Sequence, residues 1–384
     1  MSPLQHSSVL LTPGPVALSM STKREMLIDY AMDGQRIERD IAFCRDYLLQ
    51  LANAHGLGTA VPLAGSATGA NEAVIQTFLR PGDRLLVYSN GVFGDRLAAI
   101  CIAMGISHQL IRAAPTEPLS VMQLSAALLS DTQITHVMVV HCETSSGVIN
   151  PIQEIADLCR DRGKKLLIDA VSSFGVLGID MRTLGFEALT LGVNKGLQGP
   201  PGLAWIIANE ASLAACKGNA RSLTLDLWDQ WQYLEVHHNF RFTPPTHVLA
   251  AGTQALREHQ AEGRKARFGR YARNRARLVD GMREFGFETL LPPEIATPIV
   301  ATFLAPNDAQ FDPVRFSQGL AQQGFQISLR RAAVPNTLRI GCMGDLDETD
   351  MAAAVAAVGR VLLEMQAAAP HRSDMPPPEI HMSR

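Results

Sequence analysis

Four short apolar runs between residues 65 and 210 constrain the fold of this chain more than any other feature. They are hydrophobic along their whole length rather than at alternate positions: RLLVYS (84–89), THVMVVH (135–141), KLLIDA (165–170) and GLAWIIA (202–208). Strands of this composition are buried on both faces, as in a parallel sheet covered by helices. Helix-like segments lie between them, near 95–104, 120–129 and 152–162. The alternation predicts an α/β protein with a doubly wound, mainly parallel sheet.

The last third of the chain has a different pattern, which predicts a smaller α+β domain. Residues 247–284 contain no proline and are rich in Ala, Arg, Glu and Leu, so they predict one long helix or two in succession. Strand-like and helix-like segments then alternate: 298–304, 312–323, 325–329, 337–342 and 347–366. We expect a large domain over 16–260 and a small domain over 261–366, to which 1–15 also belongs. The proline-rich residues 367–384 are expected to form a loose tail.

Composition and motifs exclude several classes of function. The 384 residues are 47% hydrophobic, with a net charge of −3, so a large core is expected and a general attraction to nucleic acid or to an anionic membrane is not. The sequence contains no continuous apolar run of eighteen or more residues, the length that could span a bilayer. The sequence contains no G-x-G-x-x-G or P-loop motif. Adjacent His237 and His238 would point to opposite faces of an extended segment, so we expect no metal site. Six cysteines without C-x-x-C spacing are typical of a reduced compartment and predict a cytoplasmic protein.

The segment GSATGA (65–70) leads into a helix that we expect to start near Asn71. In an open α/β sheet, ligands bind beyond the carboxyl ends of the strands. The hydroxyls of Ser66 and Thr68 and the first N–H groups of the helix could therefore bind a phosphate there. An alternative is that Thr68 only caps the helix and that the glycines ease the turn.

Two charged residues follow later strands of the same expected sheet. Asp169 comes at the end of an apolar run, where a buried carboxylate needs a positive partner, although it could also be a helix cap. Lys195 follows another strand-like stretch and enters a loop of glycines and prolines. A lysine at the mouth of such a sheet can be desolvated, as a Schiff-base amine must be, whereas most turn lysines are simply solvated.

A phosphate cradle, a carboxylate and a lysine are the groups that pyridoxal phosphate requires. The helix end would hold the phosphate, Asp169 would keep the pyridine nitrogen protonated, and Lys195 would form the Schiff base. Phe93 follows the run at 84–89 and could stack on the cofactor ring, or it could belong to the core.

Several segments resemble a known family. They are LLTPGP (10–15), HCETSSGVINPI (141–152), DAVSSFG (169–175), NKGLQGPPG (194–202), ARSLTLDLWDQW (220–231) and RFTPPTH (241–247). From about residue 10 to 365 the chain resembles the class V (fold type I) aminotransferases, which depend on pyridoxal phosphate. Within that class it is most similar to the branch that transfers nitrogen from 2-aminoethylphosphonate to pyruvate.

The resemblance implies a role for each of a set of site residues. Lys195 corresponds to the Schiff-base lysine and Asp169 to the partner of the pyridine nitrogen. The other residues that correspond to cofactor contacts are Ser66, Ala67, Thr68, Phe93, Thr144 and Asn194, with Thr243 reaching in from the other subunit of a homodimer. Arg339 corresponds to the arginine that binds the acid group of the substrates.

The resemblance also implies the reaction, whose substrates are a small amine and a keto acid, with no nucleic acid or membrane as a partner. 2-Aminoethylphosphonate and pyruvate would give phosphonoacetaldehyde and L-alanine, a step of phosphonate catabolism. The alternatives are a related aminophosphonate, or an amino acid with glyoxylate or pyruvate, as in alanine–glyoxylate or serine–pyruvate transamination. A cysteine desulfurase would need a mobile cysteine, and Cys342 falls within an expected strand. A protein that keeps the fold only to bind a ligand would need neither Lys195 nor Asp169 in this pairing.

Overall fold

The computed structural model describes residues 8–306, 308, 311–330 and 332–367. The predicted tail at 367–384 lies outside these residues except for Ala367, and so do residues 1–7.

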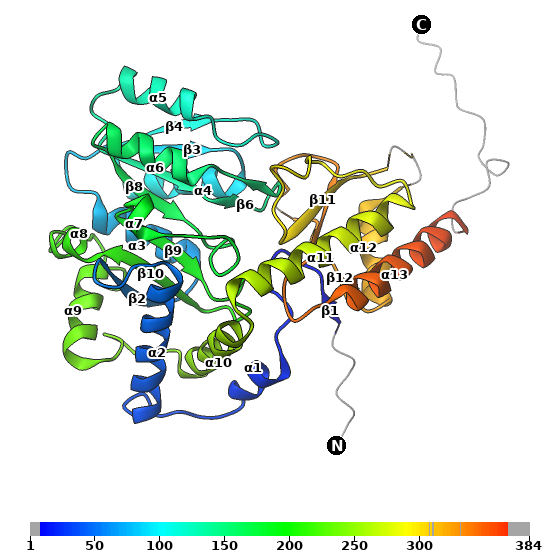
Figure 1. Cartoon of the computed structure of the whole chain (residues 1–384), viewed down its shortest axis with the longest axis horizontal. Helices are drawn as coiled ribbons and strands as arrows, with labels where there is room; N and C mark the ends of the chain where they lie inside the picture. The colour runs from blue at the N-terminus through cyan, green and yellow to red at the C-terminus, as the bar shows by residue number, and fades with distance from the viewer. Residues whose placement is uncertain (1–7, 307, 309–310, 331, 368–384) are drawn as a thin grey trace, which may run out of the picture.

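A seven-stranded sheet forms the centre of the larger part of the molecule (Figure 1). Its strands, in spatial order, are β2 (Gly58–Ala64), β10 (Leu203–Asn209), β9 (Ala188–Gly192), β8 (Lys165–Asp169), β5 (His136–Val140), β3 (Leu85–Ser89) and β4 (His108–Arg112). The pairs from β9 to β4 are all parallel. Only β10 is antiparallel to its neighbours in this sheet. The prediction of a mainly parallel sheet is confirmed, but the run at 202–208 was expected to be parallel and runs the other way.

Helices cover both faces of the sheet, as the uniformly apolar strands predict. Alternate residues of β3 point to opposite cores: Leu86 and Tyr88 join one hydrophobic cluster, and Leu85 and Val87 join the other. The helices of the first cluster are α2 (Gln35–Leu51), α5 (Val121–Ser130), α6 (Ile152–Asp161), α7 (Met181–Leu184) and α10 (Thr246–Glu262). Those of the second are α3 (Ala67–Phe78), α4 (Val92–Met104) and α8 (Glu210–Ala214), while α9 (Leu227–His237) contributes to both.

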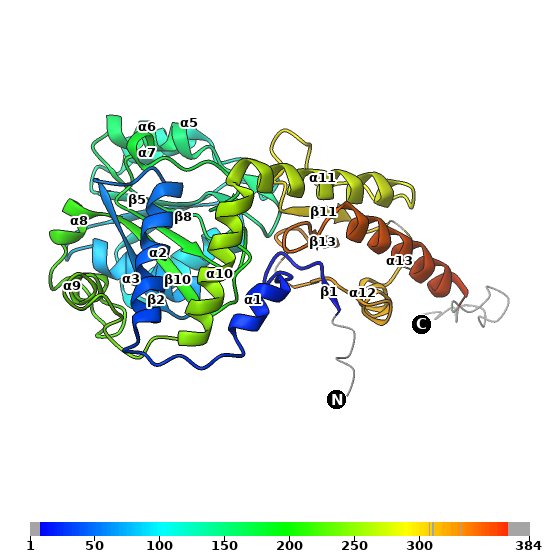
Figure 2. The ribbon, with the colours of Figure 1, turned by 60° about the horizontal axis from the view of Figure 1, so that its bottom comes forward.

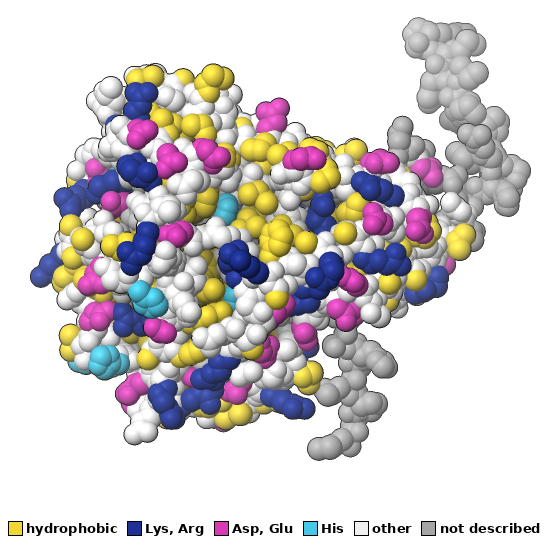
Figure 3. All heavy atoms as spheres, viewed as in Figure 1, with side chains coloured by type: hydrophobic (Ala, Val, Ile, Leu, Met, Phe, Trp, Pro, Cys, Tyr) yellow, Lys and Arg dark blue, Asp and Glu magenta, His cyan; other side chains and the backbone are white. Residues whose placement is uncertain are grey.

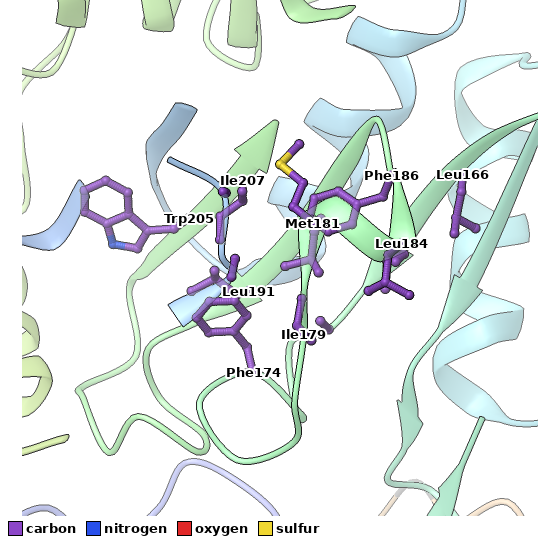
Figure 4. Packing of buried hydrophobic residues seen from close by; sticks show 14 of the residues in the cluster. Leu166, Phe174, Ile179, Met181, Leu184, Phe186, Leu191, Trp205 and Ile207 are labelled. Carbon is purple, nitrogen blue, oxygen red and sulfur yellow. The ribbon is translucent and has the colours of Figure 1, made fainter. Parts of the chain in front are cut away.

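Figure 2 shows α2 and α10 side by side over the sheet. Figure 4 shows part of the apolar packing of the first cluster. Trp205, Leu191 and Phe174 belong to this cluster and are almost completely buried. The expected helices near 95–104, 120–129 and 152–162 are α4, α5 and α6. The proline-free stretch at 247–284 forms two helices rather than one.

The C-terminal elements lie to one side of the large sheet and have their own core (Figures 1 and 2). They are α11 (Arg264–Arg283), β11 (Val300–Leu304), α12 (Pro313–Gln322), β12 (Phe325–Gln326), β13 (Thr337–Gly341) and α13 (Glu348–Ala367). Strands β11 and β13 are antiparallel, and β12 pairs with β1 (Val9–Leu10), so the N-terminal strand joins the C-terminal elements. The chain then passes through α1 (Met20–Glu25) to the large sheet. The domain boundaries predicted above stay a prediction.

Charged side chains of both signs are distributed over the surface. Positive and negative groups are interspersed over the face shown in Figure 3. Across the described ranges, no helix is both long and apolar enough to cross a membrane.

Candidate active site

One cavity of about 530 Å³ brings together most of the residues that the sequence singled out. The lining includes nine of them: Ser66, Ala67, Thr68, Phe93, Thr144, Asp169, Asn194, Lys195 and Arg339. The volume is in the range of ordinary small-molecule sites. Thr243 is not among the lining residues and is exposed on the segment before α10.

The N-terminus of α3 forms one end of the cavity. The helix begins at Ala67, four residues before the expected start near Asn71. Its cap is Ser66 rather than Thr68: the Ser66 hydroxyl accepts a hydrogen bond from the Gly69 N–H at 3.3 Å. The first N–H groups of a helix have no intrahelical partners and carry the positive end of the helix dipole. Thr68 lies in this first turn and also lines the cavity.

Arg96 adds a positive charge to this end and was missed from the sequence. It lies on α4, where it looks like an ordinary solvated helix arginine. In the structure its Nη1 donates to Thr68 Oγ1 at 3.2 Å, and its guanidinium lies 4.9 Å from the centre of the Phe93 ring. Helix N–H groups, hydroxyls and a guanidinium together form a site for an anion such as a phosphate.

Glu143 fixes the start of α4 and therefore the position of Phe93. Its Oε2 accepts hydrogen bonds from the N–H groups of Phe93 and Gly94, both at 3.1 Å. The carboxylate is fully buried on the short strand β6 (Cys142–Glu143), which pairs with β7 (Val148–Ile149). Thr144 follows it and lines the cavity.

Asp169 lies at the carboxyl end of β8 and is 7% exposed. Its two oxygens accept hydrogen bonds from Asn71 Nδ2 at 2.7 Å and from the Val171 N–H at 3.0 Å. Burial raises the pKa of the carboxyl group, while these hydrogen bonds and the charges of Arg96 and Lys195 oppose that rise in part. A buried carboxylate of raised pKa is stabilised by a further positive donor, such as a protonated ring nitrogen.

Lys195 enters the cavity three residues after β9 ends. Its Nζ donates to the Pro13 carbonyl oxygen at 2.8 Å, so the N-terminal segment covers the amine. Gly14 is what permits this approach. A Cβ built on Gly14 would lie 2.0 Å from the Lys195 Nζ. Gly14 also has a φ of +120°, which residues with a side chain rarely adopt.

The opposite wall comes from the C-terminal elements. Arg339 on β13 is 2% exposed, and its Nη1 donates to the Thr144 carbonyl oxygen at 2.8 Å. Its Nη2 donates to the carbonyl oxygen of Arg330, a residue that also lines the cavity. Arg330 was not identified from the sequence, and Pro13–Gly14 was noted only within the segment LLTPGP, because nothing in either local pattern indicates that the fold brings these residues to Lys195.

These groups fit pyridoxal phosphate. The α3 N-terminus with Arg96 suits its phosphate, Asp169 suits its protonated ring nitrogen, and the Lys195 amine suits its aldehyde. Cys342 does not offer a competing nucleophile: it is completely buried after β13, and burial raises the pKa of its thiol to about 12.

Comparisons with known proteins agree with this site. Residues 34–329 match the family model of the class V aminotransferases. The chain is 40% identical over 364 residues to a 2-aminoethylphosphonate–pyruvate transaminase of Pseudomonas putida, covering 94% of this chain and 99% of that protein. It is 39% identical over 368 residues to the enzyme of that name from Pseudomonas aeruginosa, covering 95% and 99%.

Solved structures show the same fold. The ureidoglycine–glyoxylate aminotransferase of Bacillus subtilis superposes with a TM-score of 0.86, at 24% identity, covering 96% of this chain and 95% of that one. At that identity the likeness concerns the fold alone. The family model and the curated relatives go further: the chain belongs to the class V aminotransferases and is a pyridoxal phosphate-dependent enzyme.

Proposed function

We propose that this enzyme transfers the amino group of 2-aminoethylphosphonate to pyruvate, producing phosphonoacetaldehyde and L-alanine. The observation that carries the proposal is the identity of about 40% with transaminases of that name, which extends over nearly the full length of both chains. The cavity supports it, because a lysine, a buried carboxylate and a buried arginine converge there.

The cofactor would be held at three places by residues of this chain. Ser66, Ala67 and Thr68 at the α3 N-terminus, together with Arg96, would bind its phosphate. Asp169 would bind the protonated ring nitrogen. Nearby lining residues, Phe93, Thr144 and Asn194, would contact its ring and substituents. When bound, pyridoxal phosphate supplies an aldehyde that captures amines and a protonated ring that takes up electrons from the substrate carbon.

Lys195 is the group that would move the proton. As a neutral amine, its Nζ would remove a proton from the carbon that bears the substrate nitrogen, and as an ammonium group it would deliver that proton to the carbon of the cofactor's aldehyde group. The hydrogen bond from Nζ to the Pro13 carbonyl oxygen holds the amine at the mouth of the cavity. The reaction is reversible and passes through two half-reactions, so the same amine serves the donor and the acceptor.

Arg339 would bind the acid group of each substrate in turn. Pyruvate carries its carboxylate on the reacting carbon and 2-aminoethylphosphonate carries its phosphonate one carbon further away, but a guanidinium can bind either acid. The side chain is held in the wall by its hydrogen bond to Thr144, which fixes the direction of the guanidinium.

A homodimer would complete the site. Thr243 lies outside the cavity of its own chain, next to Phe242, whose side chain is 46% exposed. Leu27 and Leu223 are also largely exposed, at 83% and 67%. Exposed apolar side chains indicate a contact surface where they lie together in one patch. Their burial between two subunits would let the partner's Thr243 reach the phosphate.

We place the enzyme in the cytoplasm. All six cysteines lie among the described residues, where each has a free and buried thiol. Unpaired cysteines are typical of a reducing compartment.

The proposed activity is tested with purified enzyme loaded with pyridoxal phosphate. With 2-aminoethylphosphonate and pyruvate, we expect alanine and phosphonoacetaldehyde in equal amounts. Alanine with glyoxylate and serine with pyruvate serve as competing substrate pairs. A kcat/KM for either pair above that for the phosphonate would contradict the proposal.

A further inference from the structure

Two arginines share the wall of the cavity opposite the cofactor-binding end. Arg339 and Arg330 both line it, as does Ser328, which forms a β-bridge with Arg339. The backbone connects the two arginines directly, because Arg339 Nη2 donates to the Arg330 carbonyl oxygen. This contact places the Arg330 backbone beside the buried guanidinium and does not use the Arg330 side chain.

The cavity carries more positive charge than the phosphate of a cofactor accounts for. Its described lining contains four cationic side chains, Arg96, Lys195, Arg330 and Arg339, and a single carboxylate, Asp169. Arg96 lies at the α3 N-terminus, where it contacts Thr68. Arg330 and Arg339 come from the C-terminal elements at the other wall, where a second anion would meet them.

A phosphonate and a carboxylate differ in the number of oxygens and charges that such a wall must bind. A carboxylate has two oxygens and one charge, which one guanidinium fork satisfies. A phosphonate is tetrahedral, with a third oxygen and a second ionisation that a carboxylate lacks, as a phosphate group also has. In the structure two nitrogens of Arg339 also donate to the carbonyl oxygens of Thr144 and Arg330. A second donor beside Arg339 would therefore matter more for the phosphonate than for the carboxylate.

We propose that Arg330 is the residue that selects a phosphonate over a carboxylate in this enzyme. Its guanidinium binds the additional oxygen and charge of the phosphonate, while Arg339 binds the part common to both acids. This inference rests on the proposed function, since it assigns the phosphonate donor to this wall. The two substrates then differ in the arginines that bind them: both arginines bind the amine donor, and Arg339 alone binds pyruvate.

The position of Arg330 allows its side chain to be removed without disturbing the wall. The side chain is exposed, on the turn between β12 and β13, and so contributes little to packing. Its contact with Arg339 is through the main-chain carbonyl oxygen, which remains when the side chain is replaced. Loss of the Arg330 guanidinium therefore isolates its electrostatic role.

The experiment compares wild type, Arg330→Ala, Arg330→Lys and the control Arg315→Ala. Arg315 is exposed on α12 and is not among the cavity-lining residues, so its replacement removes the same charge elsewhere on the C-terminal elements. The inhibition constants of ethylphosphonate, ethanesulfonate and propionate are measured for each protein. These probes share a two-carbon chain and differ in the acid group, and binding to the loaded enzyme is also measured by calorimetry.

We expect Arg330→Ala to raise the inhibition constant of ethylphosphonate about 10- to 100-fold, the usual cost of losing a charge-assisted hydrogen bond. Propionate binding and the KM for pyruvate should change less than about threefold, with ethanesulfonate between, because it has three oxygens but one charge. Arg330→Lys should keep part of the preference, since it keeps the charge and loses the fork. Arg315→Ala should match wild type.

Equal weakening of all three acids by Arg330→Ala, or no weakening of any, would overturn the assignment. This outcome is distinct from failure of the proposed function. If the wild-type enzyme does not convert 2-aminoethylphosphonate, the proposed donor is wrong. If the wild type converts it and Arg330→Ala converts it equally well, the donor stands and the role of Arg330 is refuted.

Discussion

Replacement of Gly14 by alanine tests the placement of Lys195 with a single methyl group. A Cβ at position 14 would lie 2.0 Å from the Lys195 Nζ, 2.5 Å from its Cδ and 2.6 Å from its Cε. Non-bonded atoms pack at about 3.5–4.0 Å, so the amine must retreat by more than about 1 Å. The lysine side chain is flexible and can move, but it then leaves the position from which it would act.

The expected cost falls on activity more than on folding. A displacement of about 1 Å in a reacting group can lower the rate about 100-fold. Alanine at a φ of +120° also strains the backbone, by about 1–3 kcal/mol. Gly82→Ala is the matched control, because Gly82 has a φ of +95° and open space where its Cβ would lie. Both variants should lose a similar amount of stability.

The assay measures kcat for 2-aminoethylphosphonate and pyruvate, the melting temperature, and the fraction of Lys195 that borohydride reduction joins covalently to added pyridoxal phosphate. Gly14→Ala should show about 100-fold lower kcat and reduced labelling of Lys195. Gly82→Ala should keep both near wild type. If Gly14→Ala labels and turns over as well as Gly82→Ala, the Lys195 amine does not act from the position beside Gly14, and the reasoning fails.

Three further substitutions test the roles assigned to the site. Lys195→Ala should still bind pyridoxal phosphate, without a covalent bond, while kcat falls by orders of magnitude; near-normal turnover would remove Lys195 from the mechanism. Arg339→Ala should raise KM at least about tenfold for both the phosphonate donor and pyruvate, because each loses a charge-assisted hydrogen bond; an effect on one substrate alone would assign the other acid elsewhere. Asp169→Asn should impair cofactor binding but stabilise the cofactor-free protein at pH 8, as measured by its melting temperature. Burial raises the folded-state pKa of Asp169, so the native protein binds this proton more tightly than the unfolded chain does, and wild-type stability falls as pH rises through that range. The advantage of Asp169→Asn should therefore disappear at a pH low enough to protonate Asp169, and a variant equally unstable at every pH would contradict this cause.

The asparagine also has suitable partners, which is why we expect stabilisation rather than a new unsatisfied group. Asn71 Oδ1 is buried without a hydrogen-bond partner in the structure, while Asn71 Nδ2 donates to Asp169. Rotation of the Asn71 amide by 180° would let Oδ1 accept from an asparagine at position 169. The Val171 N–H could still donate to the remaining oxygen.

Three of the residues that the sequence singled out, and that the structure brings to one cavity, lie at the ends of strands of the large sheet. Asp169 ends β8, Lys195 follows β9, and Phe93 follows β3. The carboxyl ends of parallel strands meet at one edge of a sheet, so their order in the chain is enough to predict that they converge. The direction of β10 could not be predicted from the sequence. The run at 202–208 is apolar throughout because β10 is buried on both faces, and that burial is the same whether the strand is parallel or antiparallel.

The residues that were missed reach the cavity from elements with no local signal. Arg96 lies within α4, one turn beyond Phe93, where a sequence pattern cannot tell a ligand from a solvated arginine. Gly14 and Arg330 depend on pairing between β1 and β12, which joins segments about three hundred residues apart. Thr243 could be placed only by the family resemblance, because its own chain leaves it outside the cavity.

The visible absorption spectrum of the purified, cofactor-loaded enzyme tests the central claim most directly. The spectrum is recorded before and after addition of 2-aminoethylphosphonate, with no keto acid present, and again after pyruvate is added. We expect a visible band that the amine abolishes, as the cofactor takes the amino group, and that pyruvate restores. A visible band that Lys195→Ala lacks and that 2-aminoethylphosphonate leaves unchanged would contradict the proposed donor.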